Sequence, residues 1–209
     1  MLEDKTLKEL CDLVADSAPT PGGGAVAASV GAMAVALCEM ACNVTIKKLI
    51  KLDKPIDKLQ KVSLSLNKAR EQFLKYIDAD AEGFKQVITA LRLPKSAEQE
   101  NLSREKALQN AYLTACQIPL QTMILSLDCL ILNKTVIENA DKFVVSDAYI
   151  ATHLLMSTMD SAKYNVDINL KYITDTELID KINTQLNVLS SSCYEIVKKI
   201  LETKYQPNN

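Results

Sequence analysis

Glycine is scarce in this chain, and it is unevenly placed. Only five of the 209 residues are glycine and six are proline, so the sequence offers few turn residues. Few turns over such a length predict few, long secondary-structure elements. Three of the five glycines nevertheless stand side by side in the stretch APTPGGGAVAA, residues 18–28. A chain that avoids glycine elsewhere has a particular need for it here.

Other scarce residues exclude several classes of function. Histidine occurs once, which excludes a histidine-based metal centre, and no P-loop or dinucleotide-binding fingerprint is present. The net charge is −2 without a long basic run, which argues against nucleic-acid binding. The six cysteines form no Cys-x-x-Cys pair, and the N-terminus is charged from residue 3 rather than apolar. We therefore expect a cytoplasmic protein with free thiols.

One long apolar run needs a separate explanation. Residues 25–44 carry a single charge, Glu39, and their length could span a bilayer. The run is rich in weakly apolar alanine and no second span follows, so we interpret it as a helix buried on all sides, without a membrane. Small residues recur there with a spacing of four, at Gly24, Ala28, Ala32 and Ala36. Such a row would let a second helix or a flat ligand approach closely.

The rest of the chain shows helical periodicity throughout. The expected helices cover residues 4–16, 24–50, 56–91, 97–115, 120–132, 134–142, 146–165 and 175–204. Pro119 is expected to interrupt one helical pattern, and Pro94 follows the end of another. The sequence thus predicts one all-α domain over residues 1–209, built as a bundle of long antiparallel helices.

The expected helix 56–91 carries a carboxylate in its apolar line. At about 100° per residue, its apolar side chains share one face, and Asp80 falls on that face whereas Asp78 is expected to point into water. The apolar positions are Leu59, Val62, Leu66, Ala69, Phe73, Ile77, Phe84, Val87 and Leu91. Burial raises the pKa of a carboxyl group, which makes Asp80 a candidate general acid. Pairing with a lysine or capping of a neighbouring helix would explain its position equally well.

A second polar line lies on the helix expected from residue 146. It consists of Asp147, Thr158, Ser161, Asn165 and Asn169. An unbroken helix would separate Asp147 from Asn165 by roughly 27 Å, which is too far for one small reaction centre. The line would suit a long ligand or two separate contacts. Buried polar residues satisfied by neighbouring helix ends remain the alternative.

The glycines of residues 22–24 precede the Ala-rich helix. Glycine permits a positive φ and a close approach of the backbone to a ligand. The bare N–H groups of a helix N-terminus also attract anions and carboxylates. With Pro19 and Pro21 stiffening the entry, we interpret this loop as a ligand contact, and a tight turn is the alternative.

Four stretches taken together resemble a known family. They are PTPGGGAVAASVGAMAVAL at residues 19–37, IDADAEGF at 77–84, LRLPK at 91–95 and NVDINLKYITD at 165–175. In this order they resemble the formiminotetrahydrofolate cyclodeaminase / methenyltetrahydrofolate cyclohydrolase family, over nearly the whole chain. The resemblance implies an all-helical homodimer that acts on folate one-carbon adducts without a metal or redox cofactor. One departure is Ala25, where the family commonly has Ser or Thr, and it leaves the exact reaction open.

The resemblance also implies roles for particular residues. Asp80 matches the family's proton donor, which would protonate the leaving nitrogen when 5-formiminotetrahydrofolate cyclises to 5,10-methenyltetrahydrofolate. Hydrolysis of 5,10-methenyltetrahydrofolate is the alternative reaction, and a catalytically silent folate- or protein-binding helical dimer is the alternative of another class. Lys95 is expected to contact the glutamate tail of folate. The complete set of expected substrate contacts is Pro21, Gly22, Gly23, Gly24, Lys95, Asp147, Asn165 and Asn169.

Overall fold

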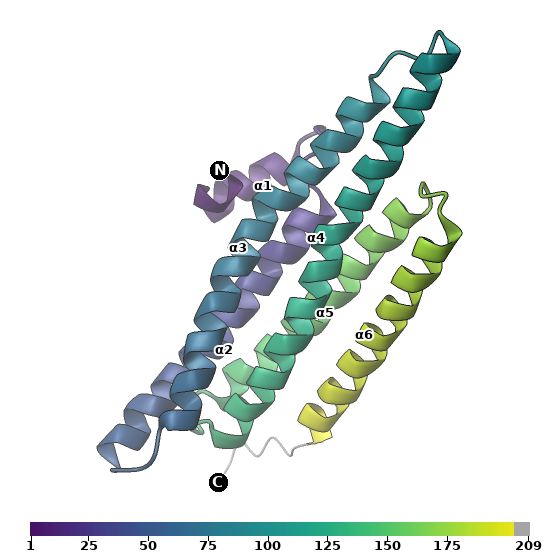
Figure 1. Ribbon diagram of the computed structural model, residues 1–209. Helices are drawn as coiled ribbons and strands as arrows, with labels where there is room; N and C mark the ends of the chain where they lie inside the picture. Colours follow the sequence, from purple (N-terminus) through teal and green to yellow (C-terminus); the bar gives the residue numbers. More distant parts are fainter. Residues whose placement is uncertain (203–209) are drawn as a thin grey trace.

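The fold is all-α, as the sequence predicts, and the computed structural model describes residues 1–202 (Figure 1). The elements are the 3₁₀ helix η1 (Leu2–Asp4) and the helices α1 (Leu7–Ala15), α2 (Gly23–Lys51), α3 (Asp57–Leu91), α4 (Glu98–Asn139), α5 (Val145–Leu170) and α6 (Thr176–Glu202). The expected extension of the last helix to residue 204, and the expected domain end at 209, lie outside the described residues.

Four long helices form the body of the bundle. Short turns connect α2 to α3, α3 to α4 and α4 to α5, so that neighbouring helices run antiparallel (Figure 1). The main packing runs in the order α2, α3, α4, α5 and back to α2. Helix α2 also contacts α4, and α6 packs on α4 and α5. The hairpin of α3 and α4 projects beyond α5 and α6 at one end of the molecule. The largest fully buried side chains are Phe73, Leu66, Met123, Leu130, Leu155, Met159, Leu186 and Ile200.

Helix α2 packs closely because its residues are small. Of the four small residues at this spacing, Gly24, Ala28 and Ala32 are buried, and Ala36 is half-buried. Gly31 lies against α3, and a Cβ built there would come within 2.6 Å of the Phe73 ring. By length and composition α2 and α4 could each cross a membrane, so the expectation that no second such segment follows is wrong. In the bundle 61% of the apolar window of α2 is buried, and Val26, Met33, Met40 and Val44 stay exposed, so α2 is not buried on all sides as expected.

Helix α4 corrects one expectation. The three segments predicted at 97–115, 120–132 and 134–142 form a single helix of 42 residues that runs through Pro119. Pro119 is buried, as are Cys116, Thr122 and Met123 beside it. Packing on both sides therefore outweighs the cost of a proline inside the helix, which is about 3 kcal/mol.

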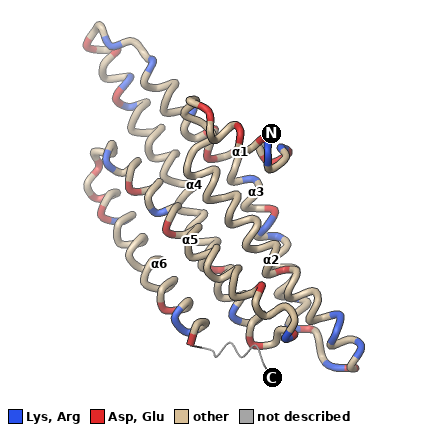
Figure 2. The backbone as a smooth tube through the Cα atoms, turned by 180° about the vertical axis from the view of Figure 1, so that it is seen from behind, with Lys and Arg blue, Asp and Glu red and all other residues tan. Residues whose placement is uncertain are grey.

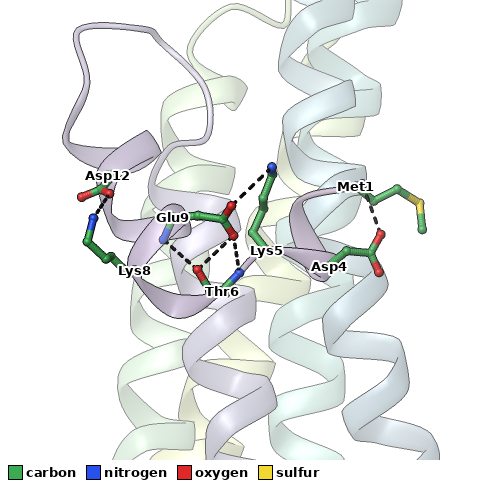
Figure 3. A network of polar contacts seen from close by, with 7 residues as sticks. All are labelled: Met1, Asp4, Lys5, Thr6, Lys8, Glu9 and Asp12. Atoms are coloured by element: carbon green, nitrogen blue, oxygen red, sulfur yellow. Dashed lines mark hydrogen bonds and ion pairs between the residues drawn. The ribbon is translucent and has the colours of Figure 1, made fainter.

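The N-terminal segment shows that a second expectation, the exposure of Asp78, is wrong. Asp78 does not point into water, because its carboxylate accepts hydrogen bonds from the backbone N–H groups of Leu2 (2.7 Å) and Glu3 (3.2 Å). Further polar contacts join Met1 to Asp4 and link Lys5, Thr6 and Glu9 at the start of α1 (Figure 3). Thr6 caps α1 by accepting from the Glu9 N–H, and the Glu9 carboxylate accepts from the Thr6 N–H in return. The helical periodicity of α3 alone contains no information about the N-terminal segment that packs on it.

Candidate active site

A cavity of about 370 Å³ opens between the glycine loop and three helices. Its walls come from segments that are far apart in the sequence. The lining residues are Pro19, Thr20 and Gly22–Gly24 of the loop and start of α2; Asp80, Phe84, Val87 and Leu91 of α3; Tyr112 and Ala115 of α4; and Asn165, Ile168, Asn169 and Tyr172 of α5 and the turn after it. From Asp80 to Leu91 the cavity follows α3 for roughly 16 Å. It is therefore an elongated site with a carboxyl group near one end.

Asp80 is the carboxyl group of this cavity. Burial raises its pKa from 3.8 to about 6, and a hydrogen bond from the backbone N–H of Ala25 opposes this rise. The helix α2 begins at Gly23, and its N-cap Gly22 has no side chain to offer. Asp80 of α3 thus supplies an acceptor at the positive end of α2. Capping and catalysis, two of the three explanations that the sequence left open for Asp80, do not exclude each other.

Gly24 is the glycine whose missing side chain matters most. A Cβ built there would lie 2.0 Å from Oδ1 and 2.5 Å from Oδ2 of Asp80, far inside van der Waals contact. At Gly22 and Gly23 a Cβ would find ordinary contacts, at 3.6 Å from the Pro19 carbonyl and 3.5 Å from Asn165 Oδ1. None of the glycines has a positive φ, so the first of the two properties that glycine offers is not used here. The glycine run instead lets the backbone of α2 meet the carboxyl group directly.

Two asparagines of α5 form the opposite wall. Asn165 donates from Nδ2 to the Ser161 carbonyl at 2.9 Å. Asn169 donates from Nδ2 both to the Asn165 carbonyl at 2.9 Å and to the Ala115 carbonyl of α4 at 3.2 Å. Their amide nitrogens are thus engaged by backbone carbonyls. Gly23 and Asn165 also border a second hollow of about 400 Å³ between α2 and α5.

An aromatic wall lies farther along the cavity from Asp80. The rings of Tyr112 and Tyr172 stack with centroids 4.6 Å apart and an angle of 13° between their planes. The side chain of Gln109 fixes the turn that carries Tyr172, since Nε2 donates to the Tyr172 carbonyl at 2.9 Å and Oε1 accepts from the Thr174 N–H at 2.9 Å. The cavity therefore combines a carboxyl group, amide groups and flat aromatic surface, which suits an aromatic ligand with polar edges.

A comparison with protein families shows to which family the chain belongs. The profile of the formiminotransferase-cyclodeaminase family matches residues 6–188. The chain belongs to this family. The matched range contains the glycine loop, Asp80, both asparagines and both tyrosines of the cavity.

Individual relatives agree with this assignment. The chain is 32% identical to a methenyltetrahydrofolate cyclohydrolase from Methylorubrum extorquens over 97% of both chains. It is 28% identical to the formimidoyltransferase-cyclodeaminase of Rattus norvegicus over 90% of its own length, but it spans only 35% of that protein. A crystal structure of formiminotetrahydrofolate cyclodeaminase from Thermotoga maritima superposes with a TM-score of 0.82 at 32% identity and covers 97% of this chain.

The structure brings together six of the predicted site residues and separates three. Gly22, Gly23, Gly24, Asp80, Asn165 and Asn169 all line the cavity. Pro21 is buried behind the loop, Lys95 is exposed in the turn between α3 and α4, and Asp147 lies in the first turn of α5. These three are not among the lining residues, and their contact with a substrate stays a prediction. For Asp147 the separation agrees with the helical distance of about 27 Å to Asn165.

Several lining residues escaped the sequence reasoning. Tyr112 and Tyr172 become a pair only because α4 and the turn after α5 meet in space. Tyr172 lies within the stretch NVDINLKYITD, and that stretch was the one available signal. Ala115 carried no signal, and neither did Gln109, which is half-buried and holds the turn without lining the cavity, since a glutamine and a small residue are ordinary on a helix. Among residues 1–202 no group of three or more His, Cys, Asp or Glu side chains is arranged to hold a metal ion.

Proposed function

We propose that this protein cyclises 5-formiminotetrahydrofolate to 5,10-methenyltetrahydrofolate with release of ammonia, with Asp80 as the proton donor. The observation that carries the proposal is the raised pKa of Asp80, about 6, in a cavity bordered by the glycine loop. A carboxyl group with such a pKa exchanges its proton near neutral pH, which general acid catalysis requires.

The proposed chemistry needs one proton in the right place. The bond between N10 and the formimino carbon forms, and the bond from that carbon to its terminal nitrogen breaks. The formimino group reacts in its protonated form, N5–CH=NH2⁺, so its terminal nitrogen takes up one further proton and leaves as ammonia. N10 releases one proton in the same reaction, so the two transfers cancel. Asp80 gives the first proton and is restored by the second. Proton transfer and positioning account for the whole reaction, so we propose that it needs no metal or redox cofactor.

Hydrolysis of 5,10-methenyltetrahydrofolate is the second candidate reaction. Its support is the relative of that name, which is 32% identical over 97% of both chains. In this reaction water attacks the same carbon, and the ionised Asp80 would accept a proton from it. The two reactions thus use the same residue in opposite protonation states.

An absorbance assay with the two folates offered separately tests the proposal. Appearance of the methenyl chromophore from 5-formiminotetrahydrofolate supports cyclisation, whereas accelerated loss of that chromophore from 5,10-methenyltetrahydrofolate supports hydrolysis. The Asp80→Asn variant should lose the activity, and Asp78→Asn, whose carboxylate binds the N-terminal backbone, serves as the matched control. Folate binding without turnover of either compound would overturn both reactions and leave a silent binding module.

We also propose that the enzyme is a cytoplasmic homodimer that associates through the face formed by α2 and α5. Large apolar side chains are exposed there, namely Val26, Met33, Met40 and Val44 on α2 and Ile150, Tyr164 and Ile168 on α5. Exposed apolar side chains gathered on neighbouring helices favour association. The cytoplasmic location rests on the six cysteines, all of which are free thiols.

A further inference from the structure

Pro119 lies inside α4 and leaves one backbone carbonyl of that helix without its usual partner. In an α-helix each carbonyl accepts from the N–H four residues later. Proline has no N–H, and its ring also pushes away the carbonyl four residues before it. For Pro119 that carbonyl belongs to Ala115, which is buried and lines the cavity.

The freed carbonyl is taken by a side chain of the cavity. Asn169 Nδ2 donates to the Ala115 carbonyl at 3.2 Å and to the Asn165 carbonyl at 2.9 Å. Only the nitrogen of an amide can donate, so these two carbonyls fix which end of the Asn169 side chain is which. Both hydrogens of Nδ2 are used, and Oδ1 is the atom that remains to meet a ligand.

We infer that Pro119 is a positioning residue, which holds the Asn169 amide so that Oδ1 accepts a hydrogen bond from an N–H group of the substrate. This inference rests on the proposed folate substrate, whose pterin ring carries amino and ring N–H donors. With alanine at position 119 the restored N–H competes for the Ala115 carbonyl. Asn169 then loses one of its two anchors, and its amide is free to rotate.

Pro119→Ala separates positioning from a purely structural role. Proline is the poorest residue in a helix interior, so α4 should tolerate the change and the melting temperature should stay equal or rise. One neutral hydrogen bond corresponds to about a threefold to tenfold change in affinity. We therefore expect KM for the folate substrate to rise by about that factor while kcat changes little. Pro55→Ala, in the exposed turn before α3, is the matched proline control and should leave KM unchanged.

A double-mutant cycle tests whether Pro119 acts through Asn169. Asn169→Ala alone should raise KM, and Pro119→Ala added to it should raise KM no further, because the group it orients is gone. Asn169→Asp offers a second variant should Pro119→Ala fail to fold. Its carboxylate cannot donate to the two carbonyls, so Asn169→Asp should raise KM by at least as much as the factor expected for Pro119→Ala.

Four outcomes would overturn the inference. An unchanged KM in folded Pro119→Ala, or additive effects of the two substitutions, would make the proline a structural feature only. A KM unchanged in Asn169→Asp would remove the role of the oriented amide. If the wild-type protein neither binds nor converts either folate, the proposed function fails, and this inference fails with it. If the wild-type protein turns over a folate with a measurable KM, a negative result in the variants counts against the inference alone.

Discussion

Asp80 combines two properties that oppose each other, since the burial that suits it for proton transfer also weakens the fold. A carboxyl group whose pKa is higher in the folded protein than in the unfolded chain is held more tightly as the acid when folded. Its pKa is about 6 instead of 3.8, so its contribution to stability is lost as pH rises through this interval. At neutral pH the protein therefore retains a buried charge that a catalytic role would explain.

The substitution Asp80→Asn should separate stability from activity. The neutral amide removes the buried charge, so the free energy of unfolding should rise by roughly 2–3 kcal/mol at pH 7.5 and by about 1 kcal/mol at pH 4.5. Turnover should fall by about a hundredfold or more. Chemical denaturation at the two pH values measures the first effect. Asp78→Asn is the control and should lose stability, since its carboxylate accepts two backbone hydrogen bonds. A gain of equal size at both pH values would contradict the assigned pKa.

The pH dependence of the rate should distinguish the two candidate reactions. A proton donor must be protonated, so cyclisation should lose kcat/KM as pH rises through about 6. A base must be ionised, so hydrolysis should instead lose kcat/KM as pH falls through the same value. Rate profiles for each folate, compared with that of the Asp80→Asn variant, measure the direction of the change. A profile without any inflection near this pH would contradict the role of Asp80.

Gly24→Ala should damage the site more than the same substitution at Gly22 or Gly23. The added methyl group would overlap the Asp80 carboxylate, whereas at Gly22 and Gly23 it would find ordinary contacts. Overpacking of this kind costs typically about 1–3 kcal/mol. We expect a lower melting temperature and a loss of turnover for Gly24→Ala. For Gly22→Ala the melting temperature should stay within about a degree or two, as expected of an ordinary contact without strain. Equal melting temperatures for the two variants would argue against the close approach of α2 to Asp80.

At the level of elements, the regular part of the fold could be predicted and the exceptions could not. The apolar line of α3 placed Asp80 correctly among buried neighbours, because helical periodicity is a local property. Asp78 was misjudged because its partners, Leu2 and Glu3, are 76 and 75 residues away in the sequence. Pro119 was misjudged because local preference favours a break, whereas tertiary packing keeps α4 whole. Both errors concern contacts between distant segments.

The candidate site follows the same division. The glycine loop, Asp80 and the two asparagines each carry a signal within a few residues of sequence, and all line the cavity. The stacked tyrosines and Gln109 depend on how α4 meets the turn after α5, which no local pattern contains. Lys95 was favoured for its position in a loop, and it lies in the exposed turn after α3, outside the cavity lining.

The turn after α5 should determine substrate affinity through Tyr172. A Tyr172 ring stacked on an aromatic substrate would contribute about 0.5–1.5 kcal/mol to binding beyond the buried area. Tyr172→Leu should therefore raise KM about twofold to tenfold with little change in kcat. Gln109→Ala should have a smaller effect in the same direction, because it frees the turn without removing the ring. Tyr194→Leu on α6 is the matched control outside the cavity and should leave KM unchanged. A lower kcat at constant KM would instead place Tyr172 next to the reacting carbon.

At the scale of the whole molecule, charge and apolar surface are separated. Lys and Arg gather at the end where α2 turns into α3 (Figure 2), and between Gly23 and Ile46 the helix α2 carries only one charge, Glu39. The exposed residues Val26, Met33 and Met40 recur there every seven positions. This spacing keeps side chains on one side of a helix, as in helices that pack against a partner. The face of α2 and α5 is thus suited to a second copy of the chain.

The proposed homodimer should therefore dissociate when charge enters this face. Burying an unpaired carboxylate is costly, so Met33→Glu, with 48% of Met33 exposed in the single chain, should shift the protein from dimer to monomer. Light scattering coupled to size-exclusion chromatography measures the mass over a range of concentrations. Leu64→Glu on α3 introduces the same charge at a leucine that is 59% exposed and outside this face, so it should leave the dimer intact. Because Gly23 and Asn165 border both the cavity that Asp80 lines and the hollow between α2 and α5, the monomeric variant should also bind folate more weakly. A wild-type protein that is monomeric at micromolar concentration, or a Met33→Glu variant that stays dimeric, would show that this face does not form the interface.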